Sequence, residues 1–315
     1  MKLNGCIFLI SARKNLLKIC LTLLERNYNH RFNYPIHIFY HGNKYDDINF
    51  RKSIQEINPK TEYHFHKILA ILPQHIQEKD LFYNKIYNEY VKTSFSKERL
   101  GYLFAITWKI NSIEDDILKK YEYFIMIDDD SWFKKPITKD LFIELNENNK
   151  LLGTAYTWNN VNSRVLDTRE QLFEYTKNYI NKYLNPQKNI NDNNTNDTNK
   201  IKSRNLREIM LKSEKYDPIH NRTYNKEFHE QKFLSGNCNI YNRKLFETKE
   251  WKQYLKEFND FGGGYKYRWG DCEIISLFYY IHIGDEFYDF KLKDKGLYHN
   301  QIKNKWDCIF DKECL

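Results

Sequence analysis

Apolar and polar positions alternate in blocks along the N-terminal part of the chain. Short apolar runs, "CIFLIS" at 6–11, "IHIFYH" at 36–41 and "YHFHK" at 63–67, are separated by segments of helical periodicity, the first near Asn15–Asn27. Short runs rich in β-branched and aromatic residues predict strands, and strands that alternate with helices predict βαβ units. We therefore expect an α/β fold with a largely parallel sheet flanked by helices.

The same alternation continues through the middle of the chain. A helical pattern from about Ser96 to Tyr121 leads into the apolar run "YFIMI", "LLGTAYTW" at 151–158 predicts the next strand, and Leu166–Tyr183 is again helical. A chain of 315 residues can bury one large core. We expect a single domain over residues 1–315.

The composition breaks sharply after the last of these helices. Residues 185–203 read "NPQKNINDNNTNDTNKIKS", which is almost entirely polar and dominated by Asn. Such a segment buries too little apolar area to offset its ordering entropy. It predicts a disordered surface insertion, with a domain boundary as the weaker alternative. Three sequons, at Asn193, Asn196 and Asn221, would matter only in the secretory lumen.

The net charge and the cysteine content do not by themselves identify the type of ligand or partner. A net charge of +8 is compatible with nucleic acid, an acidic membrane surface or a phosphorylated small molecule. However, Lys and Arg are scattered among acids, and no motif supports a nucleic-acid partner. The six cysteines lack zinc-like spacing. Pairing of Cys308 with Cys314 and free thiols both stay open.

The N-terminal segment contains an apolar run of only five residues, Cys6–Ile10, before Ser11 and Arg13 interrupt it. That run is too short for a membrane span or for a typical signal core. We therefore expect the first strand of the fold here, no transmembrane segment and a cytoplasmic protein, although the sequence does not determine the compartment.

Three adjacent acids, Asp128, Asp129 and Asp130, follow the apolar run "YFIMI". Open α/β sheets bind their ligands at the carboxyl ends of strands. Alternation along the strand and the turn after it should place Asp128 and Asp130 on one side and Asp129 elsewhere. Two carboxylates on one side suit Mn²⁺ or Mg²⁺ together with a diphosphate. A solvated loop or a helix cap is the alternative interpretation.

Two further segments contain polar residues in a distinctive setting. "GGGYKYRWGDCE", at 262–273, combines glycines that permit close backbone approach with an acid, Asp271, at a possible helix start. A structural turn with a capping Asp explains it equally well. "KGLYHNQ" places His299 after the aromatic run "EFYDF"; a single His of this kind is more often structural than a ligand.

These segments together resemble the fungal α-1,2-mannosyltransferases, glycosyltransferase family fifteen. "YKYRWGD" is similar to the family's G-G-F-[FY]-Y-E-R-W-G-D, and "YEYFIMIDDD" resembles Y-E-Y-Y-W-R-V-E-P-D. "SARKN", "RFNYPIHIF", "LFEYTKNY", "YNKEFHEQKFLSGNCNIYNRKLF" and "KGLYHN" resemble family segments in the same order. The resemblance covers nearly the whole chain.

The resemblance implies a Rossmann-like, nucleotide-sugar-binding fold of the GT-A type. It also implies an Mn²⁺-dependent enzyme that transfers mannose from GDP-mannose to a mannoside or glycoprotein glycan with retention of configuration. By position, Asp128 and Asp130 match the acids of E-P-D, and His299 matches the closing His, which the family uses as a metal ligand.

Other site residues follow from the same resemblance. Tyr102 matches the Tyr of the family's Y-R-H-M, near the acceptor and the reaction centre. Asp271 matches the acid of R-W-G-D and is the candidate for binding the acceptor hydroxyl or for general base catalysis. The residues expected to bind donor or acceptor are Arg13, Tyr224, Arg268, Trp269 and Asp129.

The departures from the family pattern lie around the sugar and the acceptor. Asn239 stands where the family has Glu, its candidate nucleophile, and an amide cannot act as a carboxylate nucleophile. Asp271 could replace it, the acceptor could attack on the face of the departing diphosphate, or the chain could be inactive. Further changes occur at Leu103, Phe104, Tyr267, Ile275 and Ser276.

These departures leave two alternatives to a mannosyltransferase. One is a glycosyltransferase that uses another nucleotide sugar on the same scaffold. The other is a non-catalytic protein that binds a glycan or a nucleotide. The family's N-terminal membrane anchor has no counterpart here, so Golgi residence does not follow from the resemblance.

Overall fold

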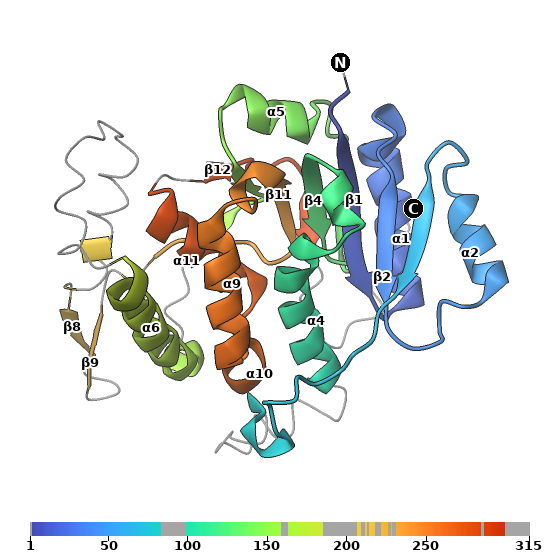
Figure 1. Cartoon of the computed structure of the whole chain (residues 1–315). Coiled ribbons are helices and arrows are strands. Elements are labelled where there is room, and N and C mark those ends of the chain that lie inside the picture. The colour runs from blue at the N-terminus through green and yellow to red at the C-terminus, as the bar shows by residue number, and fades with distance from the viewer. Residues whose placement is uncertain are drawn as a thin grey trace.

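A seven-stranded sheet runs through the centre of the molecule, with helices on both faces (Figure 1). The computed structural model describes residues 2–82, 99–158, 163–184, 207–208, 212, 214–217, 222–225, 228, 231–284 and 287–299. The strand order is β12-β6-β11-β4-β1-β2-β3. The strands are β1 (Gly5–Ser11), β2 (Ile36–Tyr40), β3 (Tyr63–Lys67), β4 (Tyr123–Ile127), β6 (Leu152–Thr154), β11 (Cys238–Asn242) and β12 (Tyr288–Asp289).

The sheet is mostly parallel, as the sequence predicts. Strands β3, β2, β1 and β4 are parallel neighbours, β12 is parallel to β6, and β11 runs antiparallel to both β4 and β6. Parallel strands need crossover connections, and the predicted alternation of helices with strands supplies them. The α/β expectation is therefore confirmed.

Helices cover both faces of the sheet. They are α1 (Lys14–Asn27), α2 (Ile48–Gln55), α4 (Arg99–Asn111), α5 (Leu141–Glu147), α6 (Ser163–Tyr183), α9 (Lys249–Phe261), α10 (Gly263–Tyr267) and α11 (Asp271–His282). Strand residues alternate between two buried clusters. Ile7 and Ile125 pack with α1 and α5, whereas Phe8 and Phe124 pack with α4, α6, α9 and α11. Both faces of the central strands are therefore buried, which explains their continuous apolar runs.

Among the residues that the structure describes, three small sheets lie outside the main one. They pair β5 (Ser131–Phe133) with β13 (Leu297–His299), β7 (Thr157–Trp158) with β10 (Phe233–Leu234), and β8 (Glu214–Asp217) with β9 (Arg222–Asn225), all antiparallel. The run 151–158 is therefore not one strand as predicted. Its first part joins the main sheet as β6, and its last two residues pair with β10 as β7.

The predicted helix over 96–121 also ends earlier, because α4 stops at Asn111 and two 3₁₀ turns follow. A residue distant in sequence stabilises this break. The buried Arg243 guanidinium donates to the carbonyl oxygens of Tyr121 (2.8 Å), Ile113 (3.3 Å) and Leu118. Carbonyls that a continuous helix would have satisfied internally thus find a partner from another element.

Several sequence predictions fall outside the described residues, among them the Asn-rich insertion at 185–203, the three sequons, Cys308 and Cys314. The cysteines within the described part, Cys6, Cys20, Cys238 and Cys272, are free thiols. Among the described residues, none of the helices has the length and apolar character that crossing a membrane requires.

Candidate metal and nucleotide-sugar site

The three consecutive acids form a tight turn at the carboxyl end of β4. Strand β4 ends at Ile127, and the N–H of Ser131 donates to the carbonyl of Asp128 over 3.0 Å to close the turn. The N–H of Asp128 donates to the carbonyl of Asn237, 2.9 Å away, just before antiparallel β11. Backbone contacts therefore fix the position of the acids at this edge of the sheet.

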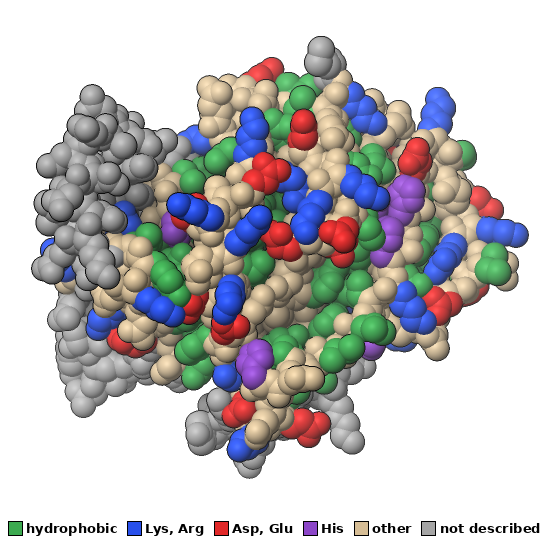
Figure 2. All heavy atoms as spheres, in the orientation of Figure 1, with side chains coloured by type: hydrophobic (Ala, Val, Ile, Leu, Met, Phe, Trp, Pro, Cys, Tyr) green, Lys and Arg blue, Asp and Glu red, His purple; other side chains and the backbone are tan. Residues whose placement is uncertain are grey.

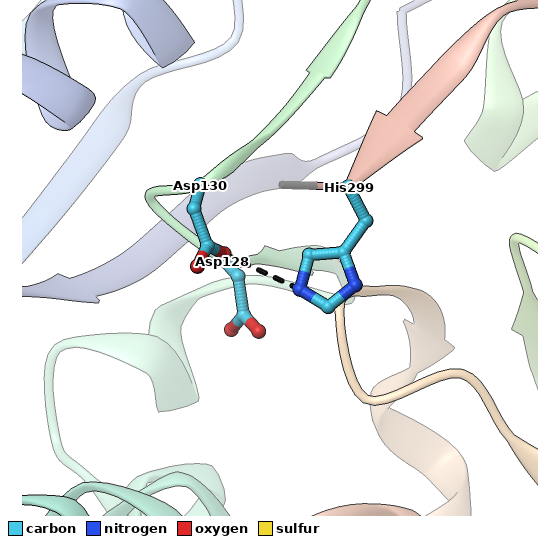
Figure 3. Close-up of side chains that lie close together, drawn as sticks. All are labelled: Asp128, Asp130 and His299. Carbon is cyan, nitrogen blue, oxygen red and sulfur yellow. Dashed lines mark ion pairs between the residues drawn. The ribbon is translucent and has the colours of Figure 1, made fainter. Parts of the chain in front are cut away.

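Asp128, Asp130 and His299 come together beside this turn (Figure 3). Each offers one ligand atom, and these atoms lie within 4.8 Å of one another. Strand β13 brings the His to the site, because it pairs with β5 so that His299 lies opposite Ser131. The Nε2 atom of His299 lies 3.5 Å from Oδ1 of Asp130. The structure thus places side by side the three residues that the sequence nominated as metal ligands.

Two carboxylate oxygens and one imidazole nitrogen form a donor set that fits a divalent metal ion. Carboxylates suit Mg²⁺ and Mn²⁺, while an imidazole nitrogen favours a transition metal over Mg²⁺, which prefers oxygen ligands. The three side chains are half-buried, which leaves room for further ligands from a substrate.

Asp129 is not part of this group; its side chain is buried and contacts Ser11 at the end of β1, the neighbouring strand. Its Oδ2 accepts hydrogen bonds from Ser11 Oγ (2.5 Å) and from Arg13 Nε (3.3 Å), and Arg13 Nη2 pairs with its Oδ1. The same guanidinium reaches Asp130, with Nη1 3.1 Å from Oδ2. Asp129 therefore holds Arg13 next to the candidate metal ligands and is itself enclosed.

Burial and the neighbouring charged groups act on the pKa of Asp130 in opposite directions. Burial alone would raise the pKa, but the hydrogen bond from His299 and the charge of Arg13 more than offset burial, so the pKa lies below its ordinary value. The carboxylate is thus kept ionised and able to coordinate a cation.

Lys109, on α4, is a site residue that the sequence analysis missed. It is 7% exposed, and its ammonium contacts Asp128 Oδ1 and lies 3.3 Å from the carbonyl oxygen of Gly236. Burial alone would lower its pKa, but the charges of Asp128 and Asp271 raise the pKa well above the ordinary value. A signal was present in the sequence, because Lys109 follows Tyr102 by two helical turns on a mostly apolar helix.

Asp271 is the first residue of α11 and is 2% exposed. Its Oδ2 atom has no hydrogen-bond partner among the described residues. Burial raises the pKa of Asp271 to about 7, the charges of Asp128 and Glu273 add to that increase, and Lys109 opposes it. A carboxyl group with a pKa near neutrality can exchange a proton with a substrate.

Tyr102 and Arg268 meet at the surface near this helix start. The Arg268 guanidinium lies 4.9 Å from the centre of the Tyr102 ring, and its Nη2 is 3.4 Å from the Tyr102 hydroxyl. Tyr102 remains 47% exposed, which is unusual for so large an aromatic residue. The pair forms a polar and aromatic surface that a sugar could contact.

Trp269 is buried, unlike its neighbour Arg268. Its ring stacks on Phe261, with centroids 5.3 Å apart, and on Tyr267, 5.1 Å apart. A Cβ atom on Gly263 would collide with the Trp269 ring, so only glycine permits this approach. The indole packs in the core and therefore anchors the loop that carries Arg268 and leads to Asp271 at the start of α11.

Asn239 lies in the middle of the sheet and is fully buried. Its Oδ1 accepts a hydrogen bond from Thr154 Oγ1 over 2.8 Å, and it sits opposite Met126 of β4 and Thr154 of β6. The structure thus places this amide on β11, three residues after Gly236, which Lys109 contacts.

The remaining predicted residues occupy other parts of the molecule. Tyr224 belongs to β9, which pairs with β8 beside α6 and apart from the main sheet (Figure 1). Leu103 and Ile275, which replace polar family residues, are buried among apolar neighbours. On the face shown in Figure 2, Lys and Arg side chains are interspersed with acids, so the net charge is spread over this surface.

Comparisons with known proteins agree with the resemblance seen in the sequence. The family model described as glycolipid 2-alpha-mannosyltransferase matches residues 1–312. No curated protein matches the chain significantly in sequence.

Solved structures of fungal enzymes share the fold. Core-mannan synthase A (CmsA/Ktr4) from Aspergillus fumigatus, in its Mn/GDP form, superposes with a TM-score of 0.67 at 18% identity, over 90% of this chain and 71% of that chain. The mannosyltransferase Ktr4p from S. cerevisiae, in complex with GDP, gives 0.68 at 20% identity, over 95% and 71% of the two chains. These solved structures therefore confirm the fold that the family resemblance implies.

Proposed function

The chain belongs to the glycolipid 2-alpha-mannosyltransferase family, and we propose that it transfers mannose from GDP-mannose to a mannoside or glycoprotein glycan with retention of configuration, with Mn²⁺ as cofactor. The observation that carries this proposal is the convergence of Asp128, Asp130 and His299 at the carboxyl edge of the sheet. A fold relative crystallised with Mn and GDP supports the choice of ion and nucleotide.

When bound at these three residues, the metal ion would stabilise the negative charge that develops on the departing diphosphate. The chain adds fixed cations of its own. Arg13 is held by the buried Asp129 and has a side chain that is 47% exposed, so it can reach a phosphate oxygen at the mouth of the site. We assign to Arg13 an electrostatic role in holding the leaving group.

Tyr102 and Arg268 provide the surface on which the acceptor sugar would rest. The half-exposed ring can stack on a sugar face, and the guanidinium that covers it can donate hydrogen bonds to hydroxyl groups. The buried Trp269 fixes the backbone of this surface, because its stacking on Phe261 and Tyr267 anchors the loop. Trp269 thus supports the acceptor surface through packing.

Asp271 is the proposed proton acceptor for the attacking hydroxyl. Its raised pKa, about 7, makes its carboxylate a stronger base than an exposed Asp. It is the first residue of α11, directly after the Arg268 loop, and its charge acts on the pKa of Lys109. The amide of Asn239 cannot replace a carboxylate nucleophile, so we propose attack by the acceptor without a covalent intermediate on that residue.

A donor panel tests the proposed function. The chain would be incubated with Mn²⁺ and either GDP-mannose or UDP-sugars, and release of the nucleoside diphosphate would be measured with and without a mannoside acceptor. Turnover with GDP-mannose is expected. Turnover with a UDP-sugar but not with GDP-mannose would show that the donor is a different nucleotide sugar. Nucleotide binding without turnover of any donor would show that the chain is a binding protein, and the amide at Asn239 would explain the lack of catalysis.

A further inference from the structure

The side chain of Lys109 contacts a carboxylate oxygen of Asp128, one of the candidate metal ligands. Its ammonium contacts Asp128 Oδ1, so a cation supplied by the protein already sits beside the space where a divalent ion would bind. The two carboxylates of the metal group carry two negative charges, and the contact with Lys109 offsets one of them. The Lys109 ammonium would therefore compete with a bound metal ion for the carboxylate of Asp128.

The backbone at Asp128 is held independently of this contact. The N–H of Asp128 donates to Asn237, and its carbonyl accepts from Ser131, so the backbone is anchored on both sides by the β4 turn. Removing the charge of Lys109 should therefore leave the backbone of the turn in place. The main consequence is electrostatic.

Lys109 also has little freedom to move away. It is 7% exposed, and its ammonium is held by the carbonyl of Gly236 in addition to Asp128. Arg13, which contacts Asp130, differs in this respect because its side chain is 47% exposed to solvent. When a metal ion binds, the buried ammonium of Lys109 therefore stays close to it.

We propose that Lys109 is a fixed internal cation that weakens binding of a divalent metal ion to Asp128, Asp130 and His299 until an anionic nucleoside diphosphate arrives, so that metal and nucleotide bind cooperatively. This inference rests on the proposed function for its nucleotide. It also explains why metal and donor would bind together, since the metal ion binds tightly only when the donor nucleotide is present.

The physical basis is simple repulsion and its relief. A divalent ion a few ångströms from an ammonium in a partly buried site is repelled by an energy that corresponds to tenfold or more in affinity. The negative charges of a diphosphate attract both cations and offset that repulsion. By linkage, the factor by which the nucleotide tightens the metal must equal the factor by which the metal tightens the nucleotide.

The test measures Mn²⁺ affinity from the electron paramagnetic resonance signal of free Mn²⁺, with and without GDP. Lys109→Met removes the charge, Lys109→Gln removes it but keeps a group that can hydrogen-bond to Asp128, and Lys109→Arg keeps the charge. Lys119→Gln is the matched control, because Lys119 forms exposed ion pairs with Glu114 and Asp116 just after α4. Circular dichroism verifies that each variant is folded.

Without nucleotide, the Met and Gln variants should bind Mn²⁺ about tenfold more tightly than the wild type. The enhancement of Mn²⁺ binding by GDP should fall by a similar factor in both. The Arg variant and the Lys119 control should behave as wild type. A folded Lys109→Gln protein that binds Mn²⁺ as weakly as the wild type, or more weakly, would overturn the proposal.

Failure of the proposed function would look different. If wild-type protein bound no GDP at any Mn²⁺ concentration, the nucleotide donor and the cooperativity would both be wrong. The Mn²⁺-only comparison of the Lys109 variants would still show whether the ammonium opposes the metal.

Discussion

The Nε2 atom of His299 lies 3.5 Å from Oδ1 of Asp130, although β13 and the β4 turn come from distant parts of the chain. Pairing of β13 with β5 creates this relationship and completes the group with Asp128. His299→Ala and Asp130→Ala should each weaken Mn²⁺-dependent GDP binding at least about tenfold, because each removes a metal ligand. Calorimetric titration of GDP with and without Mn²⁺ measures the effect.

A matched control for that prediction is His64→Ala. His64 lies on the edge strand β3 with a side chain that is 42% exposed, away from the β4 turn. It should bind GDP as the wild type does. If both site variants kept the full metal dependence of GDP binding, the assignment of these ligands would be wrong.

Asp271 should make the stability of the protein depend on pH. Its pKa is about 7 in the folded protein against 3.8 ordinarily, so folding favours the protonated form. The stability that this proton contributes is complete below about pH 4 and is lost as the pH rises through 7. Asp271→Asn, which cannot ionise, should therefore be more stable than the wild type at pH 8, by up to about 4 kcal/mol.

Urea unfolding of both proteins from pH 4 to pH 8 measures this difference. The free energies of unfolding should converge near pH 4 and diverge toward pH 8. Equal pH profiles for the two proteins would show that folding does not raise the pKa of Asp271. The same variant should lose transfer activity, since an amide cannot accept the proton of the acceptor.

Restoring the family's glutamate at Asn239 should fail to create a nucleophile. The site is fully buried in the sheet, and Thr154 donates to the amide oxygen. Asn239→Glu adds both length and an ionisable group there, so the free energy of unfolding should fall by about 3 kcal/mol or more. Asn239→Gln adds the same length without the charge and separates the two effects. A stable glutamate variant with faster transfer would contradict this prediction.

A substitution at Gly263 tests whether packing of the Trp269 ring supports the loop that carries Arg268. In Gly263→Ala the new methyl group would meet the ring of Trp269, and we expect a loss of about 1–3 kcal/mol in the free energy of unfolding. Transfer activity should fall as well, because the Trp269 ring anchors the acceptor surface. Thermal unfolding and a donor-transfer assay measure the two consequences.

The control for this substitution is Gly101→Ala. Gly101 lies within α4 and is exposed, and a Cβ atom there would meet nothing within 4 Å. Alanine should stabilise the helix by about 0.5–1 kcal/mol. The two substitutions are therefore expected to change stability in opposite directions, and an equal effect of both would remove the argument for a close contact at Gly263.

The sequence by itself determined the elements whose pattern is local. The runs of β1, β2 and β4 are mostly apolar because both faces of these strands are buried, and the helix after β1 follows from simple periodicity. The three acids Asp128, Asp129 and Asp130 could be assigned to the end of a strand because they directly follow the apolar run of β4. The motif around Asp271 identified the family, and with it the fold and the candidate metal ligands.

Only the tertiary structure decided which residues meet. Arg243 reaches three carbonyls near the end of α4 and thereby accounts for a helix boundary that periodicity had placed too late. Lys109 becomes a site residue because its helix packs it under the β4 turn, and no local pattern encodes the partner Asp128. Charges and hydrogen bonds between distant segments arise only when the chain folds, so the electrostatics of the site had to come from the structure.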